Sequence, residues 1–164
     1  MTRAVVVVDG EHYPPVVRDA IAGLPYEVLG AWLAGGSEKL RETEPDYGVP
    51  LVTALKRGEI VGMQGDRALG HRGDVAVDFF GAPARFPIGP FLLARAAGVP
   101  VLPAFCVLQP DRRYRMTVQA PLRPTRATED EALRRWVAGL ATVIARYPTQ
   151  WFNFFDPWSA DAPR

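Results

Sequence analysis

The sequence predicts an α/β fold: a mainly parallel sheet with flanking helices, and a C-terminal hairpin followed by a long helix. Ala4–Val8 is a continuous run of apolar, mostly β-branched residues, which is typical of a strand buried in a parallel sheet. Residues 101–108 and 114–120 are strand-like runs joined by Gln-Pro-Asp-Arg, which favours a turn and therefore a hairpin. Beyond Thr128, apolar residues recur at helical spacing, which predicts the long helix.

Residues 4–33 predict one βαβ unit. A helix that begins at Pro14-Pro15 separates Ala4–Val8 from a second strand at residues 26–33. The right-handed crossover of such a unit brings the ends of its two strands together. One end then carries Asp9, Glu11 and His12, and the other carries Gly35, Gly36 and Lys39.

A glycine pair followed by a lysine can bind phosphate through backbone N–H groups and one ammonium group. Asp9, Glu11, His12 and Lys39 are therefore candidate phosphate-binding residues. The spacing matches neither the P-loop nor the G-x-G-x-x-G motif. A loop histidine held by ordinary hydrogen bonds is the competing interpretation of His12.

A second candidate site follows the predicted strand at residues 60–63, which leads into Gly65-Asp66-Arg67. A carboxylate and a guanidinium side by side at a strand end are well placed to bind an anionic group. The alternative is a surface turn in which Asp66 caps the backbone and Arg67 is solvated.

Shorter elements are predicted around this strand. Residues 40–48 are a linker or the tip of a helix, and residues 53–57 give a last helical turn closed by Gly58. Residues 75–80 are a strand with two different faces, and residues 81–83 turn the chain. Residues 86–90 lead into a helix at 91–97 that Gly98 caps, and Thr128 with Glu131 forms a capping box for the last helix.

Composition limits the function classes. The 164 residues fit one domain, or one domain with a fragment, and 19 basic against 18 acidic residues give no sign of bulk nucleic-acid binding.

Cys106 is the one cysteine, so we expect a buried, reduced thiol and no internal disulfide. We find no Ser-His-Asp set and no metal-ligand spacing. Without a signal peptide or an apolar run of roughly 20 residues, we expect a cytoplasmic protein, soluble or peripheral at the inner face of the membrane.

Two further stretches predict surface features. Five arginines lie close together in the sequence and would suit an anionic membrane surface or an acidic carrier protein, although a solvated face is the simpler interpretation: Arg112, Arg113, Arg115, Arg123 and Arg126. Residues 150–158 are strongly aromatic. They either pack back over the sheet edge or place Trp151 and Trp158 at a membrane interface.

From about Leu55 to Trp158 the chain resembles the lysophospholipid acyltransferase superfamily, in the branch of the lipid A lauroyl/myristoyl and phosphatidylinositol mannoside acyltransferases. The order and spacing of several short stretches carry this resemblance. They are 55–61, Gly65-Asp66-Arg67, Phe79-Phe80-Gly81-Ala82-Pro83-Ala84, Phe86-Pro87-Ile88-Gly89-Pro90, Leu93-Ala94, Pro100-Val101-Leu102-Pro103 and Tyr147-Pro148-Thr149-Gln150-Trp151-Phe152.

The resemblance implies transfer of a fatty acyl group to the hydroxyl of a lipid or glycolipid acceptor. Acyl-CoA or acyl-carrier protein would be the donor substrate, and no bound cofactor is implied. Asp66 and Arg67 carry over as residues that line the substrate site. Pro87 and Gly89 carry over as the loop that shapes the acceptor or acyl site.

Enzymes of this kind take their base from a His-x4-Asp motif upstream of Gly-Asp-Arg. The acid position relative to His12 is Val17, and relative to His71 it is Ala76. No catalytic residue can therefore be carried over, and we expect impaired activity.

Residues 5–40 and 47–52 resemble the start of cyclic 2,3-diphosphoglycerate synthetase, an enzyme that closes a cyclic phosphoanhydride with ATP. The resemblance runs through Asp9-Gly10-Glu11-His12-Tyr13-Pro14-Pro15 and Gly35-Gly36-Ser37-Glu38-Lys39-Leu40. The P-loop that this family carries further along is absent from the sequence.

The two resemblances meet near Thr53, which divides the chain into residues 1–52 and 53–164 and predicts a gene fusion, a deletion fragment or an assembly artefact. The N-terminal unit then either substitutes for missing strands of the acyltransferase sheet or packs loosely. Two alternative functions stay open beside acyl transfer. One is a phosphoglycerate- or nucleotide-binding fragment, and the other is a non-catalytic remnant with weak membrane association.

Overall fold

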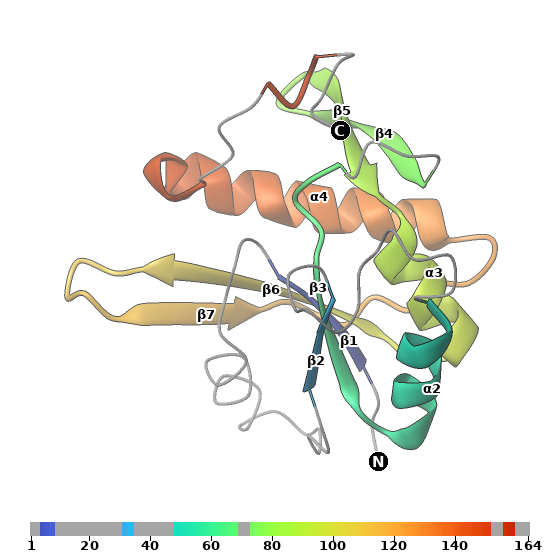
Figure 1. Cartoon of the computed structure of the whole chain (residues 1–164). Coiled ribbons are helices and arrows are strands. Elements are labelled where there is room, and N and C mark those ends of the chain that lie inside the picture. Colours follow the sequence, from blue (N-terminus) through green and yellow to red (C-terminus); the bar gives the residue numbers. More distant parts are fainter. Residues whose placement is uncertain (1–3, 9–30, 35–47, 69–72, 152–155, 160–164) are drawn as a thin grey trace.

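The computed structural model describes residues 4–8, 31–34, 48–68, 73–151 and 156–159 (Figure 1). The predicted helix after Pro14-Pro15 and the loops at 9–13 and 35–47 lie outside these residues. The described part mixes helices with strands, as expected for an α/β protein.

The main sheet has five strands in the order β2-β3-β1-β6-β7. Their bounds are β1 Ala4–Val8, β2 Ala31–Ala34, β3 Ile60–Gln64, β6 Val101–Leu108 and β7 Tyr114–Val118. β1 pairs in parallel with both β3 and β6, and β2 pairs in parallel with β3. β6 and β7 form the predicted antiparallel hairpin.

β1 lies between β3 and β6, so the sheet is continuous across the point where the two sequence resemblances meet. Of the two arrangements expected for the N-terminal segment, this is the one in which it supplies strands to the sheet. The expectation that the ends of β1 and β2 lie next to each other is wrong, however. β3, which comes later in the chain, is inserted between the two strands of the predicted βαβ unit.

A second, two-stranded sheet consists of β4 Asp74–Phe79 and β5 Ala82–Pro87. β5 is a strand that the sequence did not predict, since Pro83 and Pro87 argued for turns and loops there. Proline cannot donate a backbone hydrogen bond, but a hairpin of two strands has open edges where none is required. The connecting residues Phe80 and Gly81 have φ values of 55° and 85°, the positive sign that a tight type I′ turn requires.

Four helical segments complete the described part: α2 Gly48–Arg57, α3 Gly89–Ala97, α4 Glu129–Arg146 and the 3-10 turn η1 Pro148–Gln150. α2 begins at Gly48, whereas the sequence predicted only a last turn at residues 53–57. Pro50 lies in the first turn of α2, where proline is tolerated. Gly98 ends α3 with a φ of 68°, as predicted.

The predicted capping box of α4 does not form. Thr128 is the N-cap residue, but its side chain makes no cap hydrogen bond. Its hydroxyl oxygen instead accepts the backbone N–H of Thr125 at 3.0 Å. The preceding turn therefore occupies the group that the sequence motif assigned to the helix.

The core joins both sheets through α4, which lies between them (Figure 1). Trp136 is fully buried on α4, and its ring stacks on Phe105 of β6 at 6.1 Å between centroids. The same ring meets Phe86 of β5 edge to face at 6.3 Å. One side chain thus contacts the main sheet and the β4–β5 hairpin, which fixes their relative position.

Candidate functional site

Asp66 and Arg67 follow β3 directly, at the edge of the sheet where β1 and β2 also end. The register pairs Gln64 with Val8 of β1 and Met63 with Ala34 of β2. Three parallel strands therefore have their carboxyl ends together, which is the usual place for a ligand site in such sheets.

The two side chains differ in environment. Asp66 is only 5% exposed, whereas Arg67 is exposed. A buried carboxylate is costly unless polar groups compensate it, and an exposed Arg67 is common to both interpretations of this pair. The structure thus places a buried acidic residue next in sequence to an exposed arginine, and their role in binding an anionic group stays a prediction.

Pro87 and Gly89 belong to a different connection. Pro87 is the buried last residue of β5, and Gly89 is the first residue of α3. Between them Ile88 is 7% exposed, and its N–H donates to the carbonyl of Gly73 at 3.0 Å. These residues make a rigid strand-to-helix corner, and their role in shaping an acyl or acceptor site stays a prediction.

The alternative phosphate-binding set, Asp9, Glu11, His12 and Lys39, lies outside the described residues. The described strands show where its loops depart: β1 ends at Val8 and β2 ends at Ala34. β3 lies between these two ends, so the loop of Asp66 and Arg67 leaves the sheet between the other two departures.

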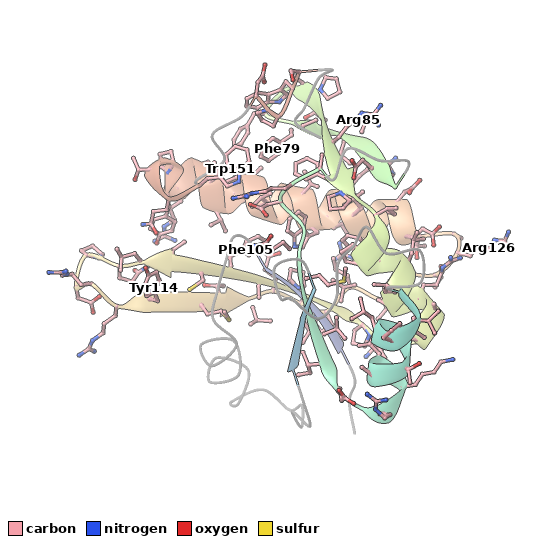
Figure 2. The ribbon with its side chains drawn as sticks, viewed as in Figure 1. Phe79, Arg85, Phe105, Tyr114, Arg126 and Trp151 are labelled. Atoms are coloured by element: carbon pink, nitrogen blue, oxygen red, sulfur yellow. The ribbon has the colours of Figure 1, made fainter. Side chains whose placement is uncertain are left out.

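An aromatic cluster around Phe79 agrees with the first alternative for the aromatic C-terminal stretch, in which it packs back on the protein, but its partners were not predicted from the sequence. The buried ring of Phe79 lies 5.2 Å from Phe86 and 5.5 Å from Trp151, and it stacks on Trp158 at 6.1 Å. The indole N–H of Trp158 donates to the backbone carbonyl of Phe79 at 2.9 Å. Figure 2 shows Phe79 and Trp151 facing each other above α4. The described ends of the C-terminal stretch thus pack on the β4–β5 hairpin.

Gln150 makes a second long-range contact that no local pattern indicates. β6 continues past its last pairing with β1 at Ala104, which leaves backbone groups of its far end without a neighbouring strand. The side chain of Gln150 accepts the N–H of Leu108 at 2.7 Å and donates to the Leu108 carbonyl at 2.9 Å. The Gln150 side chain therefore takes the place of a neighbouring strand for these two backbone groups of Leu108.

Within the described residues, no three His, Cys, Asp or Glu side chains gather in a way that could hold a metal ion. None of the helices in that part of the chain has the length and apolar character needed to cross a bilayer.

Comparisons with known proteins confirm both sequence resemblances. The model of the bacterial lipid A biosynthesis acyltransferase family matches residues 48–159. The model of the N-terminal domain of cyclic 2,3-diphosphoglycerate synthetase matches residues 3–83, so the two matches overlap over residues 48–83.

Curated relatives fall into the same two groups. A phosphatidylinositol mannoside acyltransferase of Mycobacterium tuberculosis is 32% identical over 138 residues, which is 84% of this chain and 40% of that protein. One from Mycolicibacterium smegmatis is 32% identical over 90 residues, which is 55% of this chain and 29% of that protein. A cyclic 2,3-diphosphoglycerate synthetase of Rubrobacter xylanophilus is 45% identical over 56 residues, which is 32% of this chain and 12% of that protein.

The chain spans less than half the length of each of these relatives. An alignment that covers 84% of the chain necessarily extends upstream of residue 48, so the likeness to the mannoside acyltransferases is not confined to the residues after Thr53. The family match to residues 48–159 covers more than half of the chain, which therefore belongs to the bacterial lipid A biosynthesis acyltransferase family.

Proposed function

We propose that this chain is an impaired acyltransferase, which binds a fatty acyl donor, acyl-CoA or acyl-carrier protein, for transfer to the hydroxyl of a lipid or glycolipid. The observation that carries the proposal is the family match over residues 48–159, which includes all four residues assigned to the substrate site. The glycolipid acceptor is inferred from the similarity to phosphatidylinositol mannoside acyltransferases.

Asp66 and Arg67 are the groups that we assign to an anionic part of the donor or acceptor. An exposed guanidinium can offer paired N–H donors to a phosphate, and the buried Asp66 is its neighbour in sequence. Pro87 and Gly89 are assigned to the wall of the acyl or acceptor site, because both lie in the strand-to-helix connection within the residues that match the family.

Turnover by this chain is expected to be low. General-base catalysis contributes about 10²–10⁴-fold to such reactions, and neither His12 nor His71 has an aspartate at the required spacing. We therefore expect donor binding with little or no acyl transfer.

Calorimetric titration with palmitoyl-CoA tests binding, and release of radiolabelled palmitate tests turnover. The variant Arg67→Gln should weaken palmitoyl-CoA binding by about tenfold, as expected for the loss of one charge-assisted hydrogen bond. Arg57→Gln, whose exposed guanidinium pairs with Glu59 at 2.6 Å, is the charge-matched control. The proposal fails if the folded chain shows no heat with palmitoyl-CoA or with acyl-carrier protein.

A peripheral contact with the inner face of the cell membrane belongs to the same proposal. Its support is chemical: an acceptor lipid is embedded in a bilayer, so its hydroxyl is accessible only to a protein that reaches the lipid surface.

A second candidate function is binding of a phosphoglycerate or nucleotide at the ends of β1 and β2. The match of residues 3–83 to the N-terminal domain of the synthetase supports it. Titration with 2,3-diphosphoglycerate and ATP decides the matter: heat that Lys39→Ala abolishes would support this function, and its absence would remove it.

A further inference from the structure

The β6–β7 hairpin carries an unusual concentration of exposed positive charge at its tip. Its turn and the start of β7 contain Arg112, Arg113 and Arg115 against the single acid Asp111, which gives three positive charges minus one, or a net +2. Among the described residues none of the three arginines forms an ion pair. Asp111 is engaged by the turn, since its carboxylate accepts the backbone N–H of Arg113 at 3.1 Å.

The tip also exposes apolar surface. Leu108 and Tyr114 are paired across the hairpin, so their side chains lie on the same face. Tyr114 is 65% exposed and Leu108 is 39% exposed. Since residues 105–108 of β6 extend beyond the last pairing with β1 at Ala104, the tip projects away from the body of the molecule (Figure 1).

Protection of a sheet edge does not account for this charge. Charged residues on an edge strand do prevent unwanted pairing, and β7 is an edge strand. Arg112 and Arg113, however, precede β7 and lie in the turn. Arg112 also adopts a φ of 64°, a conformation for which glycine or asparagine is the usual residue. An arginine occupies this position although the backbone conformation favours glycine.

We propose that the tip of the β6–β7 hairpin, residues 108–115, is the surface through which this protein contacts an anionic lipid bilayer. Guanidinium groups bind lipid phosphates, and a tyrosine beside a leucine suits the boundary between headgroups and acyl chains. A narrow convex tip is a poor match for a protein partner, because a stable protein interface buries about 800 Å² on each side. Lipids can surround such a tip. The inference rests on the proposed peripheral location and not on acyl transfer.

Co-sedimentation of the full chain with vesicles tests it. Vesicles of phosphatidylcholine with about one third phosphatidylglycerol should bind the protein, and pure phosphatidylcholine vesicles should bind it weakly. Each arginine near an anionic surface contributes about fivefold to partitioning, so Arg112→Gln/Arg113→Gln/Arg115→Gln should lower partitioning on the order of a hundredfold. Binding by the wild-type chain should also fall as salt rises from 0.05 to 0.5 M, because salt screens these charges.

A matched control removes the same charge elsewhere. Arg123, Arg126 and Arg134 are exposed residues outside the hairpin, and Figure 2 places Arg126 far from Tyr114. The triple glutamine variant at these positions should keep binding within a few-fold of the wild-type chain, and circular dichroism should show both variants folded.

Three results would overturn the inference. If the wild-type chain does not bind anionic vesicles, both the proposed peripheral location and the proposed role of the hairpin are wrong. Equal losses in the two triple variants mean that bulk charge, and not the hairpin, directs a membrane contact. Hairpin-dependent binding to acyl-carrier protein without vesicle binding assigns the surface to a carrier protein instead.

Discussion

At the scale of single residues, Arg112 has a left-handed backbone conformation that is unfavourable for a residue with a side chain. Its N–H donates to the Gln109 carbonyl at 2.9 Å, and the N–H of Gln109 donates to the Arg113 carbonyl at 2.8 Å. This loop is a turn followed by one left-handed residue, a pattern in which glycine is usual. An L-residue in that conformation costs about 1–2 kcal/mol.

Replacing Arg112 by glycine should therefore stabilise the fold. The relief of strain is partly offset by the entropic cost of glycine, about 0.5–1 kcal/mol, which leaves a net gain of about 0.5–1 kcal/mol in the free energy of unfolding. Urea unfolding followed by circular dichroism measures it. Arg113→Gly is the control, because it removes the same charge from a residue without positive φ and should destabilise by about 0.5–1 kcal/mol. Equal effects of the two variants would contradict the account.

At the scale of elements, α4 decides how the two sheets are joined. Its apolar stripe is evident from the sequence, and the structure shows what each part of that stripe contacts. Trp136 reaches Phe105 on one side and Phe86 on the other, whereas Trp158 packs near the surface of the hairpin and remains 42% exposed. Replacing Trp136 should therefore lower the free energy of unfolding more than replacing Trp158.

Trp136→Ala should lower the free energy of unfolding by about 3–5 kcal/mol, since it removes a fully buried ring between two sheets. Trp158→Ala should cost about 1–2 kcal/mol, for one hydrogen bond and one ring contact. Urea midpoints of both variants at equal protein concentration give the comparison. If the two losses were the same, α4 would not be the element that holds the sheets together.

At the scale of the whole molecule, the N-terminal strand is the centre of the main sheet. Val6 is paired with Gly62 on one side and with Leu102 on the other. Without β1, the described sheet would divide into β2–β3 and β6–β7. The segment that resembles another enzyme family thus supplies the central strand of the described sheet.

Val6→Pro tests this arrangement directly. Proline removes the backbone N–H in a strand with neighbours on both sides, so a ladder hydrogen bond is lost and its acceptor is left unpaired. We expect a loss of about 2–4 kcal/mol in the free energy of unfolding. Val6→Ile keeps the N–H and a β-branched apolar side chain and serves as the control. A proline variant as stable as the wild-type chain would show that the N-terminal strand packs loosely after all.

The sequence by itself determined most of the elements and the place of Asp66 and Arg67 after a strand. Ala4–Val8, the β6–β7 hairpin and α4 are each predicted by local patterns of apolar residues, because strand and helix periodicity are properties of a short window. The whole of β5 was missed because Pro83 and Pro87 suggested a turn and a loop, and the start of α2 was predicted at residue 53 and not at Gly48. A proline is tolerated where no backbone N–H is needed as a hydrogen-bond donor. Whether a donor is needed depends on the neighbouring segments, which come from elsewhere in the chain.

Only the tertiary structure decided the order of the strands, the burial of Asp66, the aromatic cluster at Phe79 and the closure of β6 by Gln150. These features depend on residues that are far apart in the sequence, such as Gln150 and Leu108, which are 42 positions apart. Which of them form depends on the burial of apolar surface and the satisfaction of backbone hydrogen bonds over the whole chain at once. Local sequence contains no record of that choice, because the same short pattern is compatible with many partners.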